Sequence, residues 1–368
     1  MKLVVVTTVP ETLFTILSGQ PNWLSQYFSV VCITSPGQMF EAVALQENVE
    51  LVSVDMVRGI NPFKDILSIY QMRKVLRRIK PDVVHSYTPK AGLVAMLGAY
   101  LAGVKVRIHT FTGLVFPTTR GFKRFILALV DRLICHAATH IVPEGVGVAN
   151  DLKSNNITTK DLDVIGNGNI AGVDVSYFAP GHNASTDISF GSAFVFCFVG
   201  RLNRDKGIKE LVSSFLRMES DAALVLVGGL DDTAPVDQET LRQIDANSRI
   251  YKAGFVKDIR PFIAASDVVV LPSYREGFPN VILQAGAMEK AVIATDINGC
   301  NEVIENGFNG WLVSPRSSDE LAEKMLYAAS LSNEELALIG KNARARIVER
   351  YEQENYRTKL LEFYRKVL

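Results

Sequence analysis

The chain has few cysteines and lacks the short cysteine spacings that bind zinc or carry out thiol redox chemistry. Cys32, Cys135, Cys197 and Cys300 are spread over 368 residues, and no two of them form a CxxC pair. Zinc ribbons and thioredoxin-like redox chemistry are therefore excluded. Since the cysteines lie mostly in apolar surroundings, we expect buried, reduced thiols in a cytoplasmic protein.

An excess of charge of either sign is also missing. Lys plus Arg and Asp plus Glu both total 39, whereas proteins that bind bulk nucleic acid normally carry a basic excess. We therefore expect no nucleic-acid partner. Residues 1–178 carry a net charge of +4 and the rest −4, which favours the N-terminal half for an anionic surface or acceptor, although an accident of composition explains so small a difference equally well.

Long hydrophobic runs are absent too. The apolar, uncharged run at residues 91–104 has only 14 residues, and a membrane span needs about 18 or more. The N-terminal sequence MKLVVVTTVPETLF is apolar only briefly, which predicts a first strand rather than a signal peptide. We expect a cytoplasmic protein that is at most peripheral at the inner face of the cell membrane.

Several nucleotide and metal motifs are missing. The turn after the first predicted strand lacks G-x-G-x-x-G, and no P-loop occurs, which argues against a dinucleotide domain and a P-loop NTPase. His136 and His140 have zincin spacing, but Ala137 stands where a zincin has Glu. Asp161 and Asp163 form a D-x-D, a pair that holds a divalent ion in some glycosyltransferases; we interpret them as solvated turn carboxylates. We expect no metal site.

Strand and helix patterns alternate along two halves of the chain. Val- and Ile-rich runs without polar alternation predict buried parallel strands. They lie at residues 2–8, 29–35, 49–56, 82–87, 106–110 and 162–165, and again at 193–199, 223–227, 249–253, 267–271 and 291–295. A helix is predicted over 62–79, where Asn61 and Pro62 mark the start and Pro81 the stop.

This alternation predicts an α/β fold with two doubly wound, Rossmann-like domains that face each other across a cleft. We place an N-terminal domain at 1–178 and a C-terminal domain at 179–350. Residues 179–189 (APGHNASTDIS) resemble a linker. The tail 351–368 is predicted to be a helix that crosses back to the N-terminal domain. Ligands of such folds bind at the carboxyl ends of the strands.

Two segments at predicted strand ends carry candidate chemistry. In the first, GRLNRDKG (200–207), Arg201 and Lys206 lie in a strand-to-helix loop, where two permanent cations favour a pyrophosphate. A solvated basic loop is the alternative. In the second, SYREGFPNVILQAGAM (273–288), Gly277 allows close backbone approach to a ligand, and the amides that follow it are suited to phosphate oxygens.

The combination of these segments resembles the large family of retaining, GT-B-fold glycosyltransferases of the family-4 type, over essentially the whole chain. HSYTPKAG (85–92) and TDINGCNEVIENGFNGWLV (295–313) are similar to members that assemble bacterial capsule, O-antigen and N-linked glycans. The resemblance implies transfer of a sugar from a nucleoside diphosphate sugar, such as UDP-hexose or UDP-HexNAc, to a glycan acceptor linked to polyprenyl diphosphate. It also implies electrostatic stabilisation by fixed cations, so neither metal nor other cofactor is expected.

The resemblance implies roles for individual residues. The catalytic candidates are Glu276, Arg201, Lys206 and His109: the two cations neutralise the donor diphosphate and Glu276 holds the donor sugar. The donor-binding candidates are Gly200, Phe255, Val256, Gly277, Phe278, Pro279, Asn280, Val281 and Gln284. The candidates on the acceptor side are Thr8, Pro10, His85, Thr88 and Lys90.

Two positions depart from the family pattern. Gln284 stands where the family has a second Glu that binds ribose, and its neutral hydrogen bond is expected to be weaker. Thr112 stands where many members have a His; His109, three residues earlier, is the alternative, and a structural role is open for it. A nucleotide-sugar epimerase on the same fold and a nucleotide-sugar-binding protein without turnover remain alternative functions.

A membrane surface is a further predicted partner. The segment 120–134 (RGFKRFILALVDRLI) combines basic and aromatic side chains in the manner of an interfacial amphipathic helix. A helix packed on the core, with basic ends, is the alternative.

Overall fold

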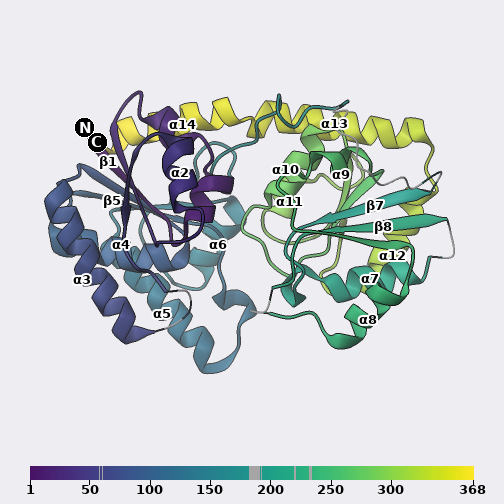
Figure 1. The fold of residues 1–368 in the computed structure, drawn as a ribbon, viewed down its shortest axis with the longest axis horizontal. Coiled ribbons are helices and arrows are strands. Elements are labelled where there is room, and N and C mark those ends of the chain that lie inside the picture. The colour runs from purple at the N-terminus through teal and green to yellow at the C-terminus, as the bar shows by residue number, and fades with distance from the viewer. Residues whose placement is uncertain (58, 60, 182–190, 192, 219–220, 232–233) are drawn as a thin grey trace. The chain divides into compact units, whose positions relative to one another are not determined.

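Short runs of Val, Ile and Leu form two six-stranded parallel sheets, one in each of two units of the chain (Figure 1). The structure is a computed structural model that describes residues 1–57, 59, 61–181, 191, 193–218, 221–231 and 234–368. The first unit comprises Met1–Ala171 and Glu354–Leu368, and the second comprises Gly172–Gln353. All strand pairs within both sheets are parallel, as expected for strands that alternate with helices.

The first unit has the strand order β3-β2-β1-β4-β5-β6. Its strands are β1 (Lys2–Val6), β2 (Ser29–Thr34), β3 (Glu50–Ser53), β4 (Val83–Tyr87), β5 (Val106–Phe111) and β6 (His140–Pro143). Its helices are η1 (Thr12–Ile16), α1 (Gln20–Leu24), α2 (Phe40–Glu47), α3 (Pro62–Ile79), α4 (Pro89–Ala102), η2 (Phe116–Thr118), α5 (Gly121–Ala137), α6 (Val146–Ser154) and α14 (Gln353–Val367).

Side chains of the central strand alternate between two apolar cores, one on each face of this sheet. Val4 and Val6 pack with buried residues of α3, α4 and α5. Leu3 and Val5 pack with buried residues of α1, α2 and α14. Covering both faces explains why these strands lack a polar side. None of the helices in the described ranges is both long enough and apolar enough to cross a bilayer.

The second unit has the strand order β12-β11-β10-β7-β8-β9. Its strands are β7 (Phe194–Val199), β8 (Ala222–Val227), β9 (Ile250–Gly254), β10 (Val268–Leu271), β11 (Ala291–Thr295) and β12 (Trp311–Val313). Its helices are η3 (Arg204–Lys206), α7 (Ile208–Leu216), α8 (Gln238–Ala246), α9 (Arg260–Ala264), α10 (Asn280–Ala287), α11 (Cys300–Val303), α12 (Ser318–Ala329) and α13 (Asn333–Tyr351). One continuous apolar core fills this unit.

Some sequence expectations differ from the structure. The predicted strand at 162–165 is wrong: only Leu162 makes an isolated bridge, to Ile141, and the chain leaves the edge of the sheet after Asp163. Strand β12 was not predicted because three residues are too short to show a period. Most of the predicted linker, 182–189, lies outside the described residues. The four cysteines are buried and none forms a disulfide bond, which confirms the predicted burial of the thiols.

Candidate functional site

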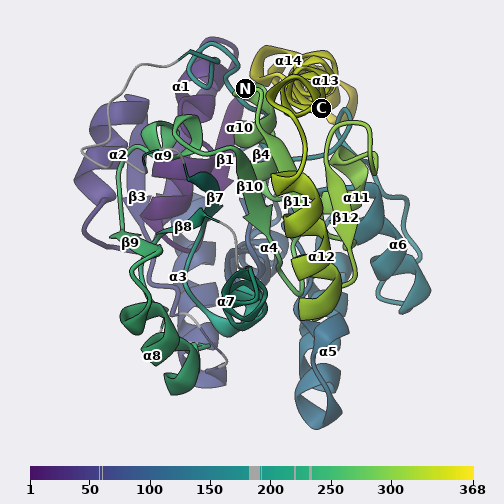
Figure 2. The ribbon, with the colours of Figure 1, turned by 90° about the vertical axis from the view of Figure 1, so that its right-hand side faces the viewer.

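The strand order of the second unit creates a switch point between β7 and β10. From β7 the chain builds the sheet outward through β8 and β9, then returns to the other side of β7 as β10. Figure 2 shows β10 between β7 and β11. Ligands of doubly wound sheets bind outside the carboxyl ends of the strands at such a point. The loops that carry Arg201, Lys206 and Glu276 follow β7 and β10, so the topology brings these predicted residues together.

The loop after β7 is ordered by its own side chains and by Asp231. The Asn203 side chain accepts a hydrogen bond from the Lys206 amide at 3.0 Å and donates one to the Asp231 carboxylate at 3.0 Å. Arg201 forms an ion pair with the same carboxylate. The Arg201 side chain is 65% exposed whereas that of Asp231 is 9% exposed, so an enclosed anion holds an accessible cation in place.

Lys206 and Glu276 form an ion pair that joins the loop after β7 to the loop after β10. Both side chains are largely enclosed, at 21% and 13% exposure. Two further contacts join these loops: Arg275 pairs with Asp205 at 2.9 Å, and the Tyr274 amide donates to the Asp205 carbonyl at 2.8 Å. The ammonium and the carboxylate are therefore fixed at one place rather than held on separate flexible loops.

Glycines allow the close approach of three loops at this edge. Gly207 has φ +69°, and a Cβ there would overlap the carbonyl of Pro272. Gly299, after β11, has φ +77°, and a Cβ there would lie 2.8 Å from Cα of Phe278. Both positions thus require glycine for conformation and for space.

Helix α10 begins at Asn280, with Pro279 as its N-cap. No side chain caps this start, and the first amides of a helix are donors suited to an anion. Gly277, Asn280, Val281 and Gln284 are partly exposed.

The remaining donor candidates have different environments. The side chain of Phe278 is buried and lies 5.4 Å from the Tyr351 ring, centroid to centroid, so only its backbone can contact a ligand. Phe255, just beyond β9, is 78% exposed, and Val256 and Gly200 are partly exposed. The exposed ring of Phe255 is available to stack on the base of a nucleotide.

In the first unit the switch point lies between β1 and β4, and Thr8 and Thr88 meet there. Their hydroxyl oxygens are 2.6 Å apart, and the Ala91 amide donates to Thr8 Oγ1 at 3.1 Å. Thr88 has φ +75° and ψ 146°, a strained conformation for a β-branched residue. Lys90 pairs with Asp65 at 2.6 Å, and Pro10 is buried.

His85 and His109 do not join this group. His85 is fully buried, with its ring nitrogens 2.7 Å from the Tyr364 hydroxyl and 2.7 Å from Thr110 Oγ1. His109 is fully buried with Nδ1 2.8 Å from Ser86 Oγ, and burial lowers its pKa to about 3. This placement does not support an acceptor contact for His85 or a catalytic contact for His109, because the side chain at an inward position of a central strand faces the core.

Sequence reasoning missed the carboxylates that hold the cations. Asp231 follows the Gly228-Gly229 turn at the end of β8, and Asp205 lies inside the GRLNRDKG segment. Their positions at strand ends were a usable signal. Among the described residues, no group of three or more His, Cys, Asp or Glu side chains is arranged to hold a metal ion.

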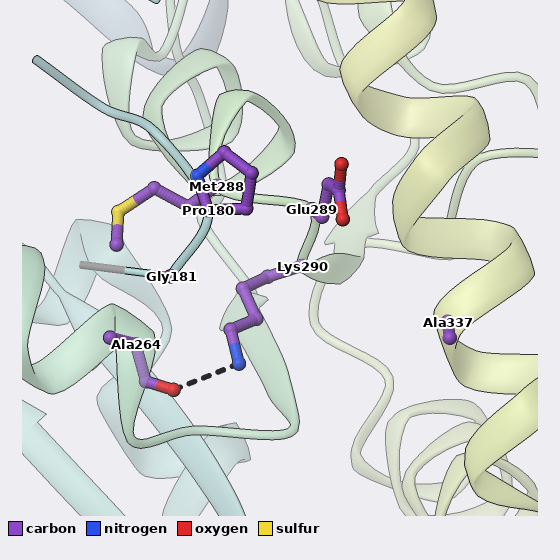
Figure 3. Close-up of a pocket in the computed structure, with 7 residues that line it drawn as sticks. All are labelled: Pro180, Gly181, Ala264, Met288, Glu289, Lys290 and Ala337. Atoms are coloured by element: carbon purple, nitrogen blue, oxygen red, sulfur yellow. Dashed lines mark hydrogen bonds between the residues drawn. The ribbon is translucent and has the colours of Figure 1, made fainter. Parts of the chain in front are cut away.

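A hollow of about 380 Å³ lies elsewhere in the second unit (Figure 3). Met288, Glu289 and Lys290, which line it, connect the end of α10 to the start of β11. The hollow is therefore at the amino edge of the sheet, opposite the strand ends that carry Lys206 and Glu276, and it is separate from the candidate donor site.

The sequence profile described as "Glycosyl transferases group 1" matches residues 193–330, and the profile described as "Glycosyl transferase 4-like domain" matches residues 25–168. The capsular polysaccharide biosynthesis glycosyltransferase CapM of Staphylococcus aureus is 30% identical over 81% of this chain and 80% of its own length. The chain belongs to the group 1, GT4-type family of glycosyltransferases.

Other relatives of this glycosyltransferase are named for lipid-linked acceptors. The UDP-Gal:α-D-GlcNAc-diphosphoundecaprenol α-1,3-galactosyltransferase of Escherichia coli is 30% identical over 80% of this chain and 77% of its own. The N,N'-diacetylbacillosaminyl-diphospho-undecaprenol α-1,3-N-acetylgalactosaminyltransferase of Campylobacter jejuni is 26% identical over 84% of each chain.

The crystal structure of Anabaena Alr3699/HepE in complex with UDP superposes with a TM-score of 0.82 at 18% identity and covers 100% of both chains. This likeness confirms the predicted GT-B fold, and the family match confirms the predicted glycosyltransferase class.

Proposed function

We propose that this enzyme is a retaining glycosyltransferase that moves a hexose or an N-acetylhexosamine from a UDP-sugar to a sugar carried on polyprenyl diphosphate. The proposal rests mainly on the pairing of Lys206 with Glu276 beside Arg201, at the β7/β10 switch point. Relatives named for diphosphoundecaprenol acceptors support the acceptor class. The reaction would assemble a surface polysaccharide or another glycan at the inner face of the cell membrane.

The ion pair gives the donor site two adjacent functions. Lys206 donates to a phosphate oxygen, while Glu276 accepts from a sugar hydroxyl. Because the two groups contact each other, ligand atoms bound by them lie on either side of the bond between sugar and diphosphate. Arg201, held by Asp231, and the first amides of α10 supply further donors for the diphosphate.

The chemical step breaks the bond between the anomeric carbon and the β-phosphate oxygen. The acceptor hydroxyl oxygen forms the new bond on the same face of the sugar, and the leaving diphosphate takes the hydroxyl proton. Negative charge therefore grows on the diphosphate, where fixed cations and amides stabilise the transition state. Removing one such preorganised donor typically lowers the rate about 100–1,000-fold.

The acceptor is assigned to the first unit. Thr8 and Thr88 place hydroxyls at its β1/β4 switch point, and Thr88 stands in a strained conformation at the start of α4. Strain of this kind is common where a backbone is held for a ligand. Lys90 lies next to this point, with its charge balanced by Asp65.

The experiment is a transfer assay with UDP-galactose, UDP-N-acetylgalactosamine, UDP-glucose and UDP-N-acetylglucosamine, each with a polyprenyl-diphosphate-linked sugar and a chelator. Mass spectrometry of the extracted lipid should show one added sugar, and NMR of the product should show the donor's anomeric configuration. An epimerised donor, or nucleotide binding with no elongated lipid for any donor, contradicts the proposal.

Two variants test the assigned roles. Lys206→Ala and Glu276→Gln should each transfer about 100–1,000-fold more slowly. Lys209→Ala, which removes an exposed cation of α7 three residues from Lys206, should transfer at the parental rate. Parental rates in both site variants reject these roles.

A further inference from the structure

Helices α3 and α5 of the first unit expose apolar side chains that soluble proteins usually bury. On α3 these are Phe63, Ile66, Leu67 and Tyr70, and on α5 they are Phe122, Phe125, Leu129 and Leu133; each is between 42% and 84% exposed. Their spacing of three and four residues places them on one stripe of each helix. The rings of Phe122 and Phe125 stack on each other, with centroids 6.3 Å apart.

Basic side chains accompany both stripes. The exposed cations are Lys64, Lys74, Arg77 and Arg78 on α3 and Lys123, Arg124 and Arg132 on α5. The only acidic residues of the two helices, Asp65 and Asp131, are buried. The exposed surface of both helices therefore combines apolar and positive groups without a single negative charge. We call these eight apolar and seven basic side chains the docking face.

The topology places the aromatic ends of both stripes at the same edge of the sheet. α3, α4 and α5 cover one face of the first unit's sheet (Figure 1), and each connects parallel strands. Their first turns therefore lie at the carboxyl edge, where Phe63 and Phe122 stand. α4 packs between α3 and α5, which separates these first turns by about 20 Å.

The carboxyl edge also carries the candidate acceptor site. The ion pair between Asp65 and Lys90 fixes the first turn of α3 beside the first turn of α4. Thr88 and Thr8 lie at that same start of α4. The exposed aromatic side chains and the hydroxyl pair thus share one edge of one unit.

We propose that the docking face binds an anionic lipid bilayer, with its aromatic ends at the interface and the Thr8–Thr88 site beside it. Aromatic rings and long basic side chains are the groups that settle at a charged membrane interface. A second copy of the chain fits this surface poorly, because a symmetric contact would place positive groups against positive groups. The link to a lipid-borne acceptor rests on the proposed function; the binding itself does not.

The test measures sedimentation of the full-length protein with vesicles of phosphatidylcholine alone and of phosphatidylcholine with about one-third phosphatidylglycerol. Anionic vesicles should bind the protein, and salt should weaken the binding. The double variants Phe122→Ser/Phe125→Ser and Phe63→Ser/Leu67→Ser should each bind at least tenfold more weakly. The control Leu45→Ser removes an equally exposed apolar side chain from α2, on the other side of the sheet, and should bind as the parent does.

Two charge-removing variants isolate the electrostatic contribution to vesicle binding. Lys64→Gln/Lys123→Gln should weaken binding to anionic vesicles, whereas Lys105→Gln, an exposed lysine just before β5, should not. The proposal is overturned if the parent binds neither vesicle, if the Phe122/Phe125 and Phe63/Leu67 variants bind as well as the parent, or if those substitutions instead abolish a dimer of the parent.

A transfer assay separates this proposal from the proposed function. With an acceptor on a short, water-soluble lipid chain, the Ser double variants should match the parent, and with vesicle-embedded acceptor they should be at least tenfold slower. Absence of transfer with every donor would contradict the proposed function and leave the vesicle result standing. Equal loss on both acceptors would contradict the docking role.

Discussion

His85 and His109 are ionisable residues that are fully buried in the first unit's sheet. Burial lowers the pKa of His85 well below its ordinary value and lowers that of His109 to about 3. Both imidazoles are therefore neutral in the folded protein near neutral pH. His109 Nε2 is buried without a hydrogen-bond partner among the described residues, and Gly92 leaves room for the ring. Burial and internal hydrogen bonds of this kind favour a structural role for both histidines.

Neutral burial of His109 predicts a pH-dependent contribution to stability. Below about pH 6.5 the unfolded chain binds a proton at His109 and the folded protein does not. The stability that neutral His109 contributes above pH 6.5 is therefore lost as the pH falls. Burial raises the pKa of Asp131 to about 7, so this residue makes the folded protein more stable as the pH falls. The effect of His109 is therefore isolated by comparing a His109 variant with the parent at each pH.

The destabilisation caused by His109→Gln should be about 2 kcal/mol smaller at pH 5 than at pH 7.5, measured by urea unfolding. His136→Gln, an exposed position on α5, should show no such difference. A constant effect of His109→Gln at both pH values would contradict neutral burial.

Residue contacts at the donor site could be predicted in part. Lys206 and Glu276 follow strands, and parallel strand ends meet at one edge, so their proximity is a consequence of topology. Their direct pairing and the roles of Asp231 and Asp205 could not be predicted, because side-chain direction within a loop depends on contacts such as the Asn203 hydrogen bonds. The direction of His109 likewise depends on strand register.

At the scale of elements, the site consists of loops between strands and helices, and their close packing sets its geometry. The loop after β7 contacts the loop after β10 at Gly207. The loop after β11 contacts the same β10 loop at Gly299. These contacts position the start of α10 against the Lys206–Glu276 pair. The packing of these loops and the ion pairs between them together hold the predicted donors in place.

Gly207→Ala should destabilise the protein and weaken nucleotide binding. The substitution adds the cost of a left-handed conformation, about 1–2 kcal/mol, to an overlap with the Pro272 carbonyl. Gly307→Ala is the matched control, since Gly307 has φ +84° but nothing within 4 Å of its Cβ position. Chemical denaturation should show a larger loss for Gly207→Ala, and equal losses would contradict tight packing at this contact.

The predicted ends of helices and strands match the structure where capping residues or other local sequence signals mark them clearly. The helix predicted over 62–79 has these bounds in α3, because the Asn61 side chain accepts from the Lys64 amide and Lys80 ends the helix in a left-handed conformation. The segment 162–165 resembled a strand but lies at an edge, where hydrogen bonding to β6 stops after Asp163. Whether an edge segment pairs with its neighbouring strand depends on tertiary contacts, which the local amino-acid composition does not reveal.

At the scale of the whole molecule, the chain forms two α/β units and then returns to the first. From Glu354 onward, α14 belongs to the first unit, where Tyr356, Leu360, Phe363 and Tyr364 complete one core. The division into two α/β halves was predictable from the repeated strand–helix pattern. The boundaries predicted at 178/179 and 350/351 remain predictions; the units described by contacts change at 171/172 and 353/354.

Leu360→Ala should destabilise the first unit selectively. Leu360 is fully buried in the α14 core, and truncating such a leucine costs about 2–5 kcal/mol. Hydrogen exchange should report faster opening of β1 and β4, with β7 and β10 unchanged. The control Leu338→Ala, at an exposed position of α13, should change neither unit, and loss of protection in both units after Leu360→Ala would contradict separate cores.

The central claim is that Lys206 and its neighbours at the β7/β10 edge bind the diphosphate of a nucleotide sugar. Isothermal titration of UDP into the parent, Lys206→Ala and Lys209→Ala, with a chelator present, tests it most directly. Loss of one charge-assisted hydrogen bond should weaken binding at least tenfold, so we predict this for Lys206→Ala and unchanged affinity for Lys209→Ala. Equal affinity of Lys206→Ala and the parent, or no UDP binding at all, would contradict the claim.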